Sequence, residues 1–264
     1  MSRYPERIVC LTEETTETLY LLEEDWRIVG ISGFTVRPPR ARKEKPKVSA
    51  FTSAKIGKIL DLDPDLVLAF SDLQADIAAE LVRNGVNVHV FNHRSVEEIL
   101  QMIRMLGGMI GCEQKAQALA DELERGLDDI RESASKLPRR PKVYFEEWDE
   151  PMISGIRWVS ELVEIAGGED ICKARSRESL AKNRIHENGD EVIAAKPDII
   201  FGSWCGKKFR PEKVKAREGF DVIPAVRDEQ LFEIKSPIIL QPGPAALTEG
   251  VREIHEHIRR WAGQ

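Results

Sequence analysis

The sequence predicts an α/β protein made of two similar lobes with parallel, Rossmann-like sheets, joined by one long helix, with a ligand cleft between the lobes. Three observations carry this prediction. Strand-like apolar runs alternate with helical segments, a Pro-Asp pattern occurs twice, and a long amphipathic segment separates the two copies. Alternation of strands and helices is typical of parallel sheets with right-handed crossovers. A chain of 264 residues is long enough to bury two cores of modest size.

The repeat is clearest around the two Pro-Asp pairs. The segment 59–68 (ILDLDPDLVL) is similar to the segment 192–201 (VIAAKPDIIF). Each contains the end of a helix, a proline that ends it, and an apolar run without polar alternation. Runs of this kind are typical of strands that are covered on both faces.

The repeat extends to both sides of these segments. In the first half we expect strands at 7–11, 28–31, 66–70 and 86–91, a loop at 12–16, and helices at 17–22 and 75–83. In the second half we expect strands at 142–145, 199–201 and 231–234, a loop through Trp148 and Pro151, and a helix at 159–166 that ends at Gly167-Gly168.

The connection between the halves reads as one helix. Residues 113–136 carry apolar side chains at close to helical spacing, and Pro138 and Pro141 follow. A helix of this length spans about 36 Å, enough to serve as a stiff spine along both lobes. We therefore predict a first lobe at 1–111, a spine helix at 112–137 and a second lobe at 138–264.

Composition excludes several classes of function. The net charge of −6 argues against nucleic acid as a partner. The basic run 37–43 contains two prolines without helical spacing, so we expect a solvated loop there. No stretch approaches the ~20 apolar residues of a membrane span. The four cysteines form no CxxC pair, which favours reduced, mostly buried thiols over a zinc or redox site, although one disulfide stays open.

Candidate ligand contacts follow from the sheet. Ligands of open parallel sheets bind at the carboxyl ends of the strands, which selects the segments 12–16, 32–39, 50–53, 71–72, 146–158 and 202–208. Large rings concentrate in these predicted loops, namely at Phe34, Phe51, Trp148, Trp158 and Trp204. Exposed aromatic rings favour a large, flat, apolar ligand, whereas the alternative is that the rings cap the local core.

Catalytic and metal motifs are missing from the sequence. It contains no GxSxG, P-loop or GxGxxG pattern, and the adjacent acids at 13–14 and 146–147 have poor geometry for acid-base work. We therefore expect a binding protein that is not an enzyme, with no metal site and no cofactor of its own.

Several segments together resemble the helical-backbone solute-binding proteins of ABC importers. These are 7–9 with 15–17, Pro38-Pro39, Val48-Ser49, 64–67, Ser154-Gly155 and 167–171, so the resemblance covers nearly the whole chain. The family binds vitamin B12, haem and iron siderophores, and the similarity is closest to the vitamin B12-binding branch. The resemblance implies a cobalamin-like corrinoid ligand that carries its own cobalt.

The resemblance also implies a set of pocket residues. Phe34 and Phe51 match two rings that flank the corrin, Met152 matches an apolar contact, and Trp204 and Cys205 lie in the loop after the second Pro-Asp strand. Arg184 replaces a tryptophan of the vitamin B12-binding branch, and an arginine can hold a carboxylate or phosphate in bidentate fashion. We expect Ser71, Asp72 and Lys207 to orient the ligand. Cys205 and His186 are candidate metal ligands if the bound species has an open axial position.

Docking on a permease is implied only in part. Family members dock through one acid on each lobe; Asp190, with Glu191 beside it, matches this position in the second lobe, but Gly57 stands there in the first. No signal peptide precedes the strand at 7–11, so we expect a cytoplasmic protein if Met1 is the native start and a periplasmic one if a leader was removed. A stand-alone corrinoid carrier is therefore the alternative to an importer component.

Two further functions stay open. The same fold with haem or a ferric siderophore would require several basic residues, for which Arg184, Lys207, Lys208 and Arg157 are available. A cytoplasmic two-lobed tetrapyrrole chelatase would need a histidine with a nearby carboxylate, and His186 with Glu187 is the candidate pair.

Overall fold

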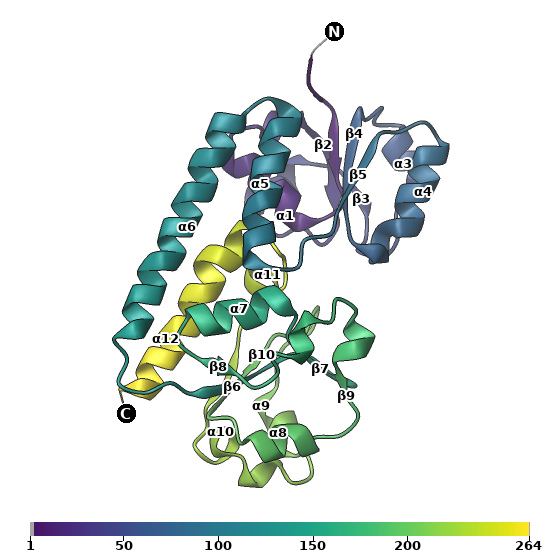
Figure 1. The fold of residues 1–264 in the computed structure, drawn as a ribbon. Coiled ribbons are helices and arrows are strands. Elements are labelled where there is room, and N and C mark those ends of the chain that lie inside the picture. The colour runs from purple at the N-terminus through teal and green to yellow at the C-terminus, as the bar shows by residue number, and fades with distance from the viewer. Residues whose placement is uncertain (1–2, 264) are drawn as a thin grey trace. The chain divides into compact units, whose positions relative to one another are not determined.

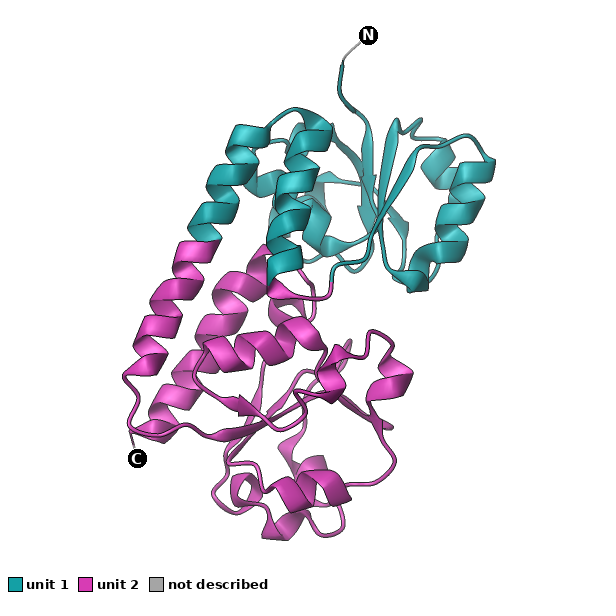
Figure 2. Cartoon of the chain, in the orientation of Figure 1, with its two compact units in different colours: residues 1–93, 97–123 teal, residues 94–96, 124–264 magenta. Residues whose placement is uncertain are grey.

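The computed structural model describes residues 3–263 and divides the chain into two compact units (Figures 1 and 2). The first unit extends to His93 and continues at Glu97–Leu123, and the second comprises Arg94–Val96 and the chain from Glu124 onward. The division falls within α6 (Glu113–Ser135), the single 23-residue helix predicted between the halves. The assignment of residues 1–111, 112–137 and 138–264 to two lobes and a spine stays a proposal.

The first unit contains a five-stranded parallel sheet with the order β3-β2-β1-β4-β5. Its strands are β1 (Ile8–Cys10), β2 (Ile28–Ser32), β3 (Lys47–Ser49), β4 (Leu66–Phe70) and β5 (Val88–Phe91). All five residues of β4 are buried, as the apolar run predicts. The core on one face of the sheet is formed by Val9, Leu11, Val48, Ile59, Val67, Ala69, Ile77 and Leu81.

Helices and short turns connect these strands. They are α1 (Glu13–Leu21), α2 (Pro39–Glu44), α3 (Ile56–Leu60), α4 (Ala75–Arg83), α5 (Val96–Ile110) and the 3₁₀ turns at Asp25–Arg27 and Asp72–Gln74. The close approach of α5 and α6 requires Gly107, because a Cβ there would lie 2.2 Å from the Cβ of Ala116. The helix α4 has the predicted limits.

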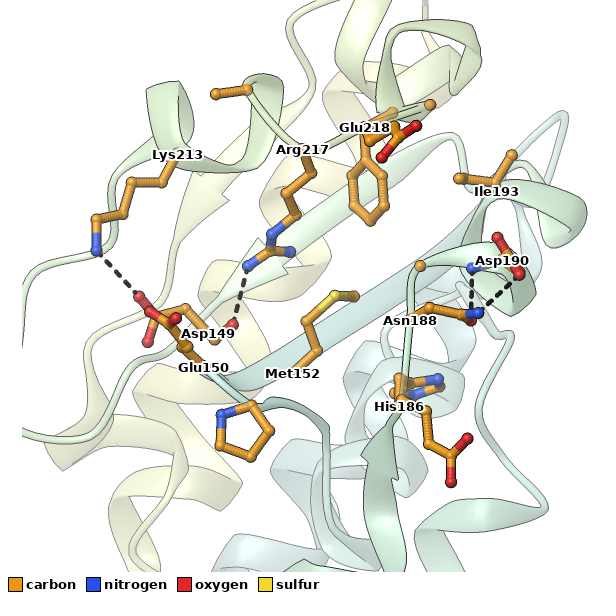
Figure 3. Close-up of a pocket in the computed structure, with 16 residues that line it drawn as sticks. Asp149, Glu150, Met152, His186, Asn188, Asp190, Ile193, Lys213, Arg217 and Glu218 are labelled. Carbon is orange, nitrogen blue, oxygen red and sulfur yellow. Dashed lines mark hydrogen bonds and ion pairs between the residues drawn. The ribbon is translucent and has the colours of Figure 1, made fainter.

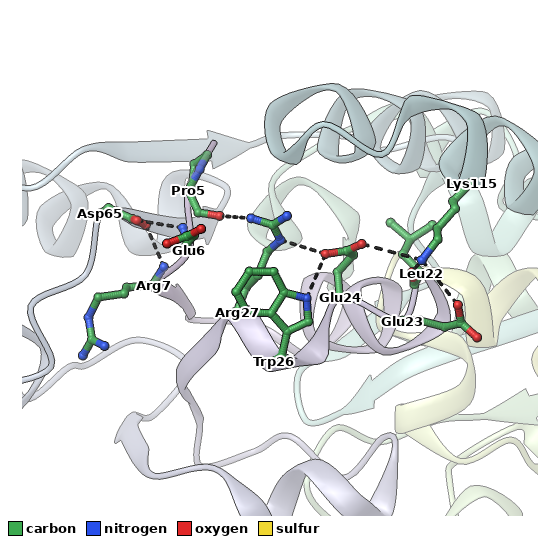
Figure 4. A network of polar contacts seen from close by, with 10 residues as sticks. All are labelled: Pro5, Glu6, Arg7, Leu22, Glu23, Glu24, Trp26, Arg27, Asp65 and Lys115. Carbon is green, nitrogen blue, oxygen red and sulfur yellow. Dashed lines mark hydrogen bonds and ion pairs between the residues drawn. The ribbon is translucent and has the colours of Figure 1, made fainter. Parts of the chain in front are cut away.

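A polar network fastens the N-terminal segment and α6 to the first sheet (Figure 4). The Asp65 carboxylate accepts backbone N–H groups of Glu6 at 2.7 Å and Arg7 at 3.0 Å. The Glu24 carboxylate accepts the guanidinium of Arg27 at 2.8 Å and lies 3.6 Å from the ammonium of Lys115 on α6. These contacts join the start of β1, the turn before β2 and the first half of α6.

The second unit contains a six-stranded sheet. Its main path is β11-β10-β6-β7-β9, and β8 pairs with β6 outside this path. The strands are β6 (Lys142–Asp149), β7 (Met152–Ser154), β8 (Glu169–Asp170), β9 (Ile185–His186), β10 (Ile199–Gly202) and β11 (Leu231–Glu233). The sheet is parallel except at β7, which runs antiparallel to both β6 and β9.

The remaining elements of the second unit surround this sheet. They are α7 (Arg157–Ile165), α8 (Asp190–Ala195), α9 (Pro211–Lys215), α10 (Pro224–Arg227), α11 (Ser236–Ile239), α12 (Val251–Ala262), a π-helical turn at Ala246–Gly250, and 3₁₀ turns at Arg175–Arg177, Ala181–Arg184 and Phe220–Val222. One core cluster includes Tyr144 of β6, Ile200 of β10, and the rings of Trp204, Phe209 and Phe220.

The internal repeat is confirmed at atomic detail. The strands β1, β4 and β5 pair in the same parallel order as β6, β10 and β11. Asp198 accepts the backbone N–H of Lys142 at 2.8 Å, just as Asp65 accepts that of Arg7. The aspartate of each Pro-Asp pair therefore anchors the start of the first strand of its own sheet.

Four predicted details were wrong. Residues 12–16 are not a loop, because α1 begins at Glu13 and its first turn is buried. The strand β6 continues to Asp149, so Trp148 lies in a strand, and Trp158 lies in α7. The basic run 37–43 is not a loop throughout, because Pro39 occupies the first turn of α2, where proline needs no hydrogen-bond partner.

Among the described residues, every helix is too short or too polar to span a bilayer.

Candidate functional site

Gln74 holds the carboxyl edge of the first sheet together. Its side-chain amide donates to the backbone oxygens of Leu11 at 3.3 Å and Phe51 at 2.8 Å, and its Oε1 accepts the N–H of Phe70 at 3.0 Å. The side chain is fully buried. It therefore ties together the segments that follow β1, β3 and β4. Sequence reasoning missed this residue, and the only signal was a polar side chain directly before the helix at 75–83.

Phe34 and Phe51 lie at this edge, after β2 and β3. The ring of Phe34 is 60% exposed, the largest exposure among the large hydrophobic side chains, and its N–H donates to the Ser32 hydroxyl at 3.2 Å. Phe51 is partly buried, with its carbonyl held by Gln74. The first unit thus presents an apolar ring to solvent at the edge where parallel sheets bind ligands.

Ser71 and Asp72 follow β4 at the same edge. Ser71 is buried, and its hydroxyl accepts the N–H of Leu73 at 3.3 Å, so it already caps the turn that follows. Its φ of 60° lies in the left-handed region, which makes the turn after β4 tight. Asp72 is exposed. Of this pair, Asp72 offers its side chain to solvent.

Buried carboxyl groups lie behind this edge in the first turn of α1. Glu13 accepts the N–H of Val36 at 3.1 Å, and Glu14 accepts the hydroxyl of Thr12. Burial raises the pKa of both carboxyl groups to about 7, despite these hydrogen bonds. Glu17, one turn on, pairs with Arg37 at 2.9 Å. The segment 12–16, which was selected as a candidate ligand contact, is therefore buried.

The second sheet carries a buried ion pair at its carboxyl edge. Glu146 of β6 is fully buried and accepts two N–H groups of Arg217, at 2.6 and 2.9 Å. The indole N–H of Trp204 donates to the same carboxylate at 2.9 Å. Trp204 is only 2% exposed. Its ring is therefore part of the core beneath the edge, with its polar atom satisfied by Glu146.

Arg184 is also buried and paired. Its guanidinium lies 2.6 Å from the Glu147 carboxylate and donates to the carbonyl of Ser154. Only 1% of the residue is exposed. The arginine expected to hold an acidic group of a ligand thus has a carboxylate of its own chain as its partner.

Cys205 and Lys207 are exposed at this edge, and Trp148 is partly buried beside them. The ammonium of Lys207 lies 3.9 Å from the centre of the Trp148 ring, a cation–π contact, and it also pairs with Asp149. Lys213 lies 3.4 Å from the same carboxylate. Cys205 is exposed, although partial burial raises the pKa of its thiol.

Trp158 and Met152 have different surroundings. Trp158 is 4% exposed and donates its indole N–H to the carbonyl of Ile239 at 2.9 Å, so it belongs to the core.

Met152 lines a cavity of about 740 Å³ in the second unit (Figure 3). The cavity lies between the turn that joins β6 to β7, the start of α8, and the segment 213–220. Met152, Ile193 and Phe220 give it apolar walls, and Asp149, Lys213 and Arg217 line it with ion pairs.

Asp190 and Glu191 lie in the first turn of α8. Asp190 accepts the side-chain amide of Asn188 at 2.8 Å. One terminal nitrogen of Arg175, Nη2, donates to both carboxylate oxygens of Glu191, at 2.6 and 2.7 Å. The Glu191 carboxylate also lies 3.0 Å from Nδ1 of His186. Glu191, and not Glu187 as predicted, is therefore the acid paired with His186. Gly57 lies in α3, where an added side chain would meet open space.

Two lobes with parallel-dominated sheets and a single long helix define the class of two-lobed solute-binding proteins, as the sequence predicts. The chain belongs to the periplasmic binding protein family, whose model matches residues 8–238. Members of this family are non-enzymatic carriers of small molecules. The resemblance drawn from the short motifs is thereby confirmed.

Relatives of this chain are distant but extend over nearly all of it. An uncharacterized ABC transporter substrate-binding lipoprotein of Bacillus subtilis is 25% identical and aligns with 98% of this chain and 81% of its own. A vitamin B12-binding protein of Vibrio parahaemolyticus is 24% identical, over 96% and 89%.

Solved structures show the same fold. The periplasmic vitamin B12-binding protein of Vibrio cholerae has a TM-score of 0.78 at 21% identity, over 98% of this chain and 99% of its own. A periplasmic haem-binding protein of Roseiflexus has a TM-score of 0.80 at 22% identity, over 96% and 99%.

Proposed function

We propose that this chain binds a cobalamin-like corrinoid between its two lobes as the solute-binding component of an ABC importer. The observation that carries the choice of ligand is the pairing of the basic residues. An anionic siderophore or the propionates of haem would need free cations. Arg184, Lys207 and Arg157 pair instead with Glu147, Asp149 and Glu161. A surface of rings and internally neutralised charges favours a large, flat ligand that brings few acidic groups.

The proposed contacts differ in role. Phe34, Phe51 and Trp148 would cover the ligand, while Met152, Ser71, Asp72, Lys207 and Cys205 would border it. Trp158, Trp204 and Arg184 are proposed to act from beneath the surface, because each is buried and hydrogen-bonded to its own lobe. This division gives Phe34, which is exposed, and the partly buried Phe51 and Trp148 most of the binding free energy.

We further propose that docking on a permease relies on the second lobe. Asp190 and Glu191 begin α8, and the matching position of the first lobe has only Gly57. Function outside the cytoplasm agrees with the lipoprotein and periplasmic relatives. A stand-alone corrinoid carrier in the cytoplasm is the alternative, since a one-sided acidic contact weakens electrostatic docking.

Haem or a ferric siderophore is the second candidate ligand. Haem-binding proteins are as similar in fold as the vitamin B12-binding protein, with TM-scores of 0.80 and 0.81 against 0.78. Lys208 is exposed and forms no ion pair with the described residues, so one cation is available for an acidic group. The test must therefore include these ligands.

The experiment is a titration with cyanocobalamin that follows tryptophan fluorescence and the corrin absorption bands together. We expect saturable one-to-one binding that an excess of haem or ferric siderophore does not displace. Loss of a buried phenyl ring costs about 1.5–2 kcal/mol, so the double variant Phe34→Ala/Phe51→Ala should bind about 100-fold to 1000-fold more weakly.

Trp26→Ala is the matched control. Trp26 is 56% exposed, like Phe34, but it precedes β2 whereas Phe34 follows it, so the two rings lie at opposite edges of the sheet. Its removal should leave the affinity unchanged. An absence of corrinoid binding at tens of micromolar, with tight binding of haem or a siderophore, would replace the proposed ligand and keep the carrier role.

A further inference from the structure

A thiol, an imidazole and a carboxylate form a chain in the second unit that the proposed carrier role does not use. Cys172 follows β8, His186 lies in β9 and Glu191 lies in α8. The Sγ atom of Cys172 lies 3.7 Å from Nε2 of His186, and Nδ1 of the same ring lies 3.0 Å from Oε2 of Glu191. Cys172 and His186 are 8% and 5% exposed. Three separate segments thus meet at one buried imidazole.

The surroundings of the ring favour one tautomer. The Glu191 carboxylate lies close to Nδ1, although off the line of an ideal hydrogen bond, and its negative charge favours a proton there. Arg175 fixes this carboxylate through contacts of 2.6 and 2.7 Å. Nε2 is then left with a lone pair that faces the thiol of Cys172.

This arrangement is that of a metal-ligating histidine. Such a histidine commonly has a carboxylate at its other nitrogen, which sets its orientation and makes it a better ligand. At the distances that zinc shows, about 2.3 Å from sulfur and about 2.0 Å from nitrogen, the observed 3.7 Å between Sγ and Nε2 corresponds to an S–metal–N angle of about 120°. Both atoms can therefore reach one cation, at an angle that leaves room for a third ligand from solvent.

Space and access are also present. A cavity of about 260 Å³ is lined by Cys172, His186, Glu191 and Arg175, and His186 also lines the larger cavity of the second unit. No group of three or more described His, Cys, Asp and Glu residues converges as a metal site, so the protein supplies two donors here. Two donors of which one is a thiolate suit a soft cation that accepts low coordination numbers.

We propose that Cys172 and His186 bind a soft monovalent cation of the Cu(I) and Ag(I) class, with Glu191 orienting the imidazole. The thiol releases one proton to solvent as the metal–sulfur bond forms, and no electron is transferred. Before binding, the thiol faces Nε2 of His186. The site lies wholly in the second unit and does not depend on the identity of the ligand carried between the lobes.

The test uses Ag(I) as a redox-stable probe on the full chain with Cys205→Ser. This background removes the exposed thiol, which would otherwise bind the cation by itself. Affinity is measured by competition with a chelator of known Ag(I) affinity, and the imidazole is followed by nitrogen NMR. We expect one Ag(I) per chain, a change in the Nε2 resonance of His186, and a rise in the midpoint of thermal unfolding.

Variants assign the two ligands. Cys172→Ser should abolish uptake, and His186→Gln should weaken it at least tenfold. Glu191→Gln should weaken it about tenfold, the usual loss for a residue that orients a metal ligand. Cys112→Ser is the matched control, since Cys112 is a partly buried thiol for which uptake should be unchanged.

Two results would overturn the proposal. Uptake that survives Cys172→Ser would place the cation elsewhere. Uptake with an unshifted His186 resonance and an unchanged affinity in His186→Gln would reduce the site to a thiol alone. A metal-free melting curve of each variant, compared with that of the background chain, separates loss of the site from loss of the fold.

Discussion

Replacement of Arg217 by methionine tests the buried ion pair of the second sheet most directly. Glu146 is fully buried, and Arg217 supplies two of the three N–H groups that its carboxylate accepts, at 2.6 and 2.9 Å. Arg217→Met would leave a buried negative charge with Trp204 as its remaining donor. Breaking a buried pair in this way costs about 3–5 kcal/mol. At about 4 kcal/mol the folded state loses on the order of a thousandfold in its equilibrium with the unfolded state.

The assay is urea denaturation followed by tryptophan fluorescence. Four of the five tryptophans, all but Trp26, lie in the second unit, so the signal reports mainly on the lobe that contains the ion pair. The double variant Glu146→Gln/Arg217→Met removes the charge together with its partner. It should therefore be more stable than Arg217→Met alone. Together with Glu146→Gln alone, the two variants complete a double-mutant cycle that measures the coupling between the residues.

An exposed pair of the same lobe provides the control. Lys215 and Glu229 lie 2.8 Å apart at the surface, and Lys215→Met should leave the unfolding curve unchanged. The reasoning would be refuted if Arg217→Met cost less than about 1 kcal/mol. It would also be refuted if restoring neutrality at Glu146 recovered no stability.

Three further predictions concern single side chains. Burial raises the pKa of Glu13 and Glu14 to about 7 from a normal 4.5, so the folded state binds these protons more tightly than the unfolded state. The folded state is therefore destabilised as pH rises from 4.5 to 7, because these carboxyl groups must then ionise while buried. Glutamine cannot ionise, so Glu14→Gln should raise the midpoint of thermal unfolding at pH 8 and change it little at pH 5. Gln74→Leu removes three hydrogen bonds worth about 1 kcal/mol each, so urea denaturation should show a loss of about 3 kcal/mol. Gly202→Ala places a Cβ 1.9 Å from the ring of Phe209, and the same assay should show a cost of about 1–3 kcal/mol.

Each of these predictions has its own contradicting result. An equal rise of the thermal unfolding midpoint in Glu14→Gln at pH 5 and pH 8 would show that ionisation of Glu14 is not the cause. Unchanged corrinoid affinity in a folded Gln74→Leu chain would show that this side chain does not position Phe51. A Gly202→Ala chain as stable as the parent would mean that the ring of Phe209 moves freely. Gly57→Ala, where an added Cβ meets open space, is the control.

The elements with strong periodicity and clear ends were predictable from sequence. The helix at 75–83 has the predicted limits, and the long helix differs from the prediction by one residue at its end. Both have apolar residues at regular helical spacing and a polar or proline-rich boundary. The strand at 66–70 is buried throughout, so its apolar run left no competing interpretation.

The end of β6 could not be predicted, because its charged residues resemble a loop. Glu146 and Glu147 interrupt the apolar run, but each is neutralised by an arginine far along the chain, at positions 217 and 184. The start of α1 was missed for a similar reason, since buried glutamates are rare and Glu13 and Glu14 are read as exposed. The pairings that decide both cases join segments 23 to 71 residues apart, which periodicity does not reveal.

The location of the candidate site stays a prediction, but the structure shows where its residues lie. Phe34 and Trp148 lie at the carboxyl ends of their sheets, as the sequence predicts. Whether a side chain at such an edge faces solvent or the core depends on its hydrogen-bond partner. The partners of Arg184, Trp158 and Trp204 are Glu147, Ile239 and Glu146, which lie far away along the chain and follow no pattern that the sequence shows. Gln74 was missed because its function depends on three backbone groups.

The first sheet consists only of residues 8–91, and the helices of its unit are complete at residue 135, before β6 begins at Lys142. The N-terminal lobe can therefore fold on the ribosome while the second lobe is still unsynthesised. The second lobe differs, because β6 pairs with β10 and β10 pairs with β11, whose residues are made some 50 to 90 positions after those of β6. During synthesis Glu146 has no ion-pair partner until Arg217 has been made. The time needed to translate the segment between these two residues is therefore the time during which the incomplete second lobe can misfold.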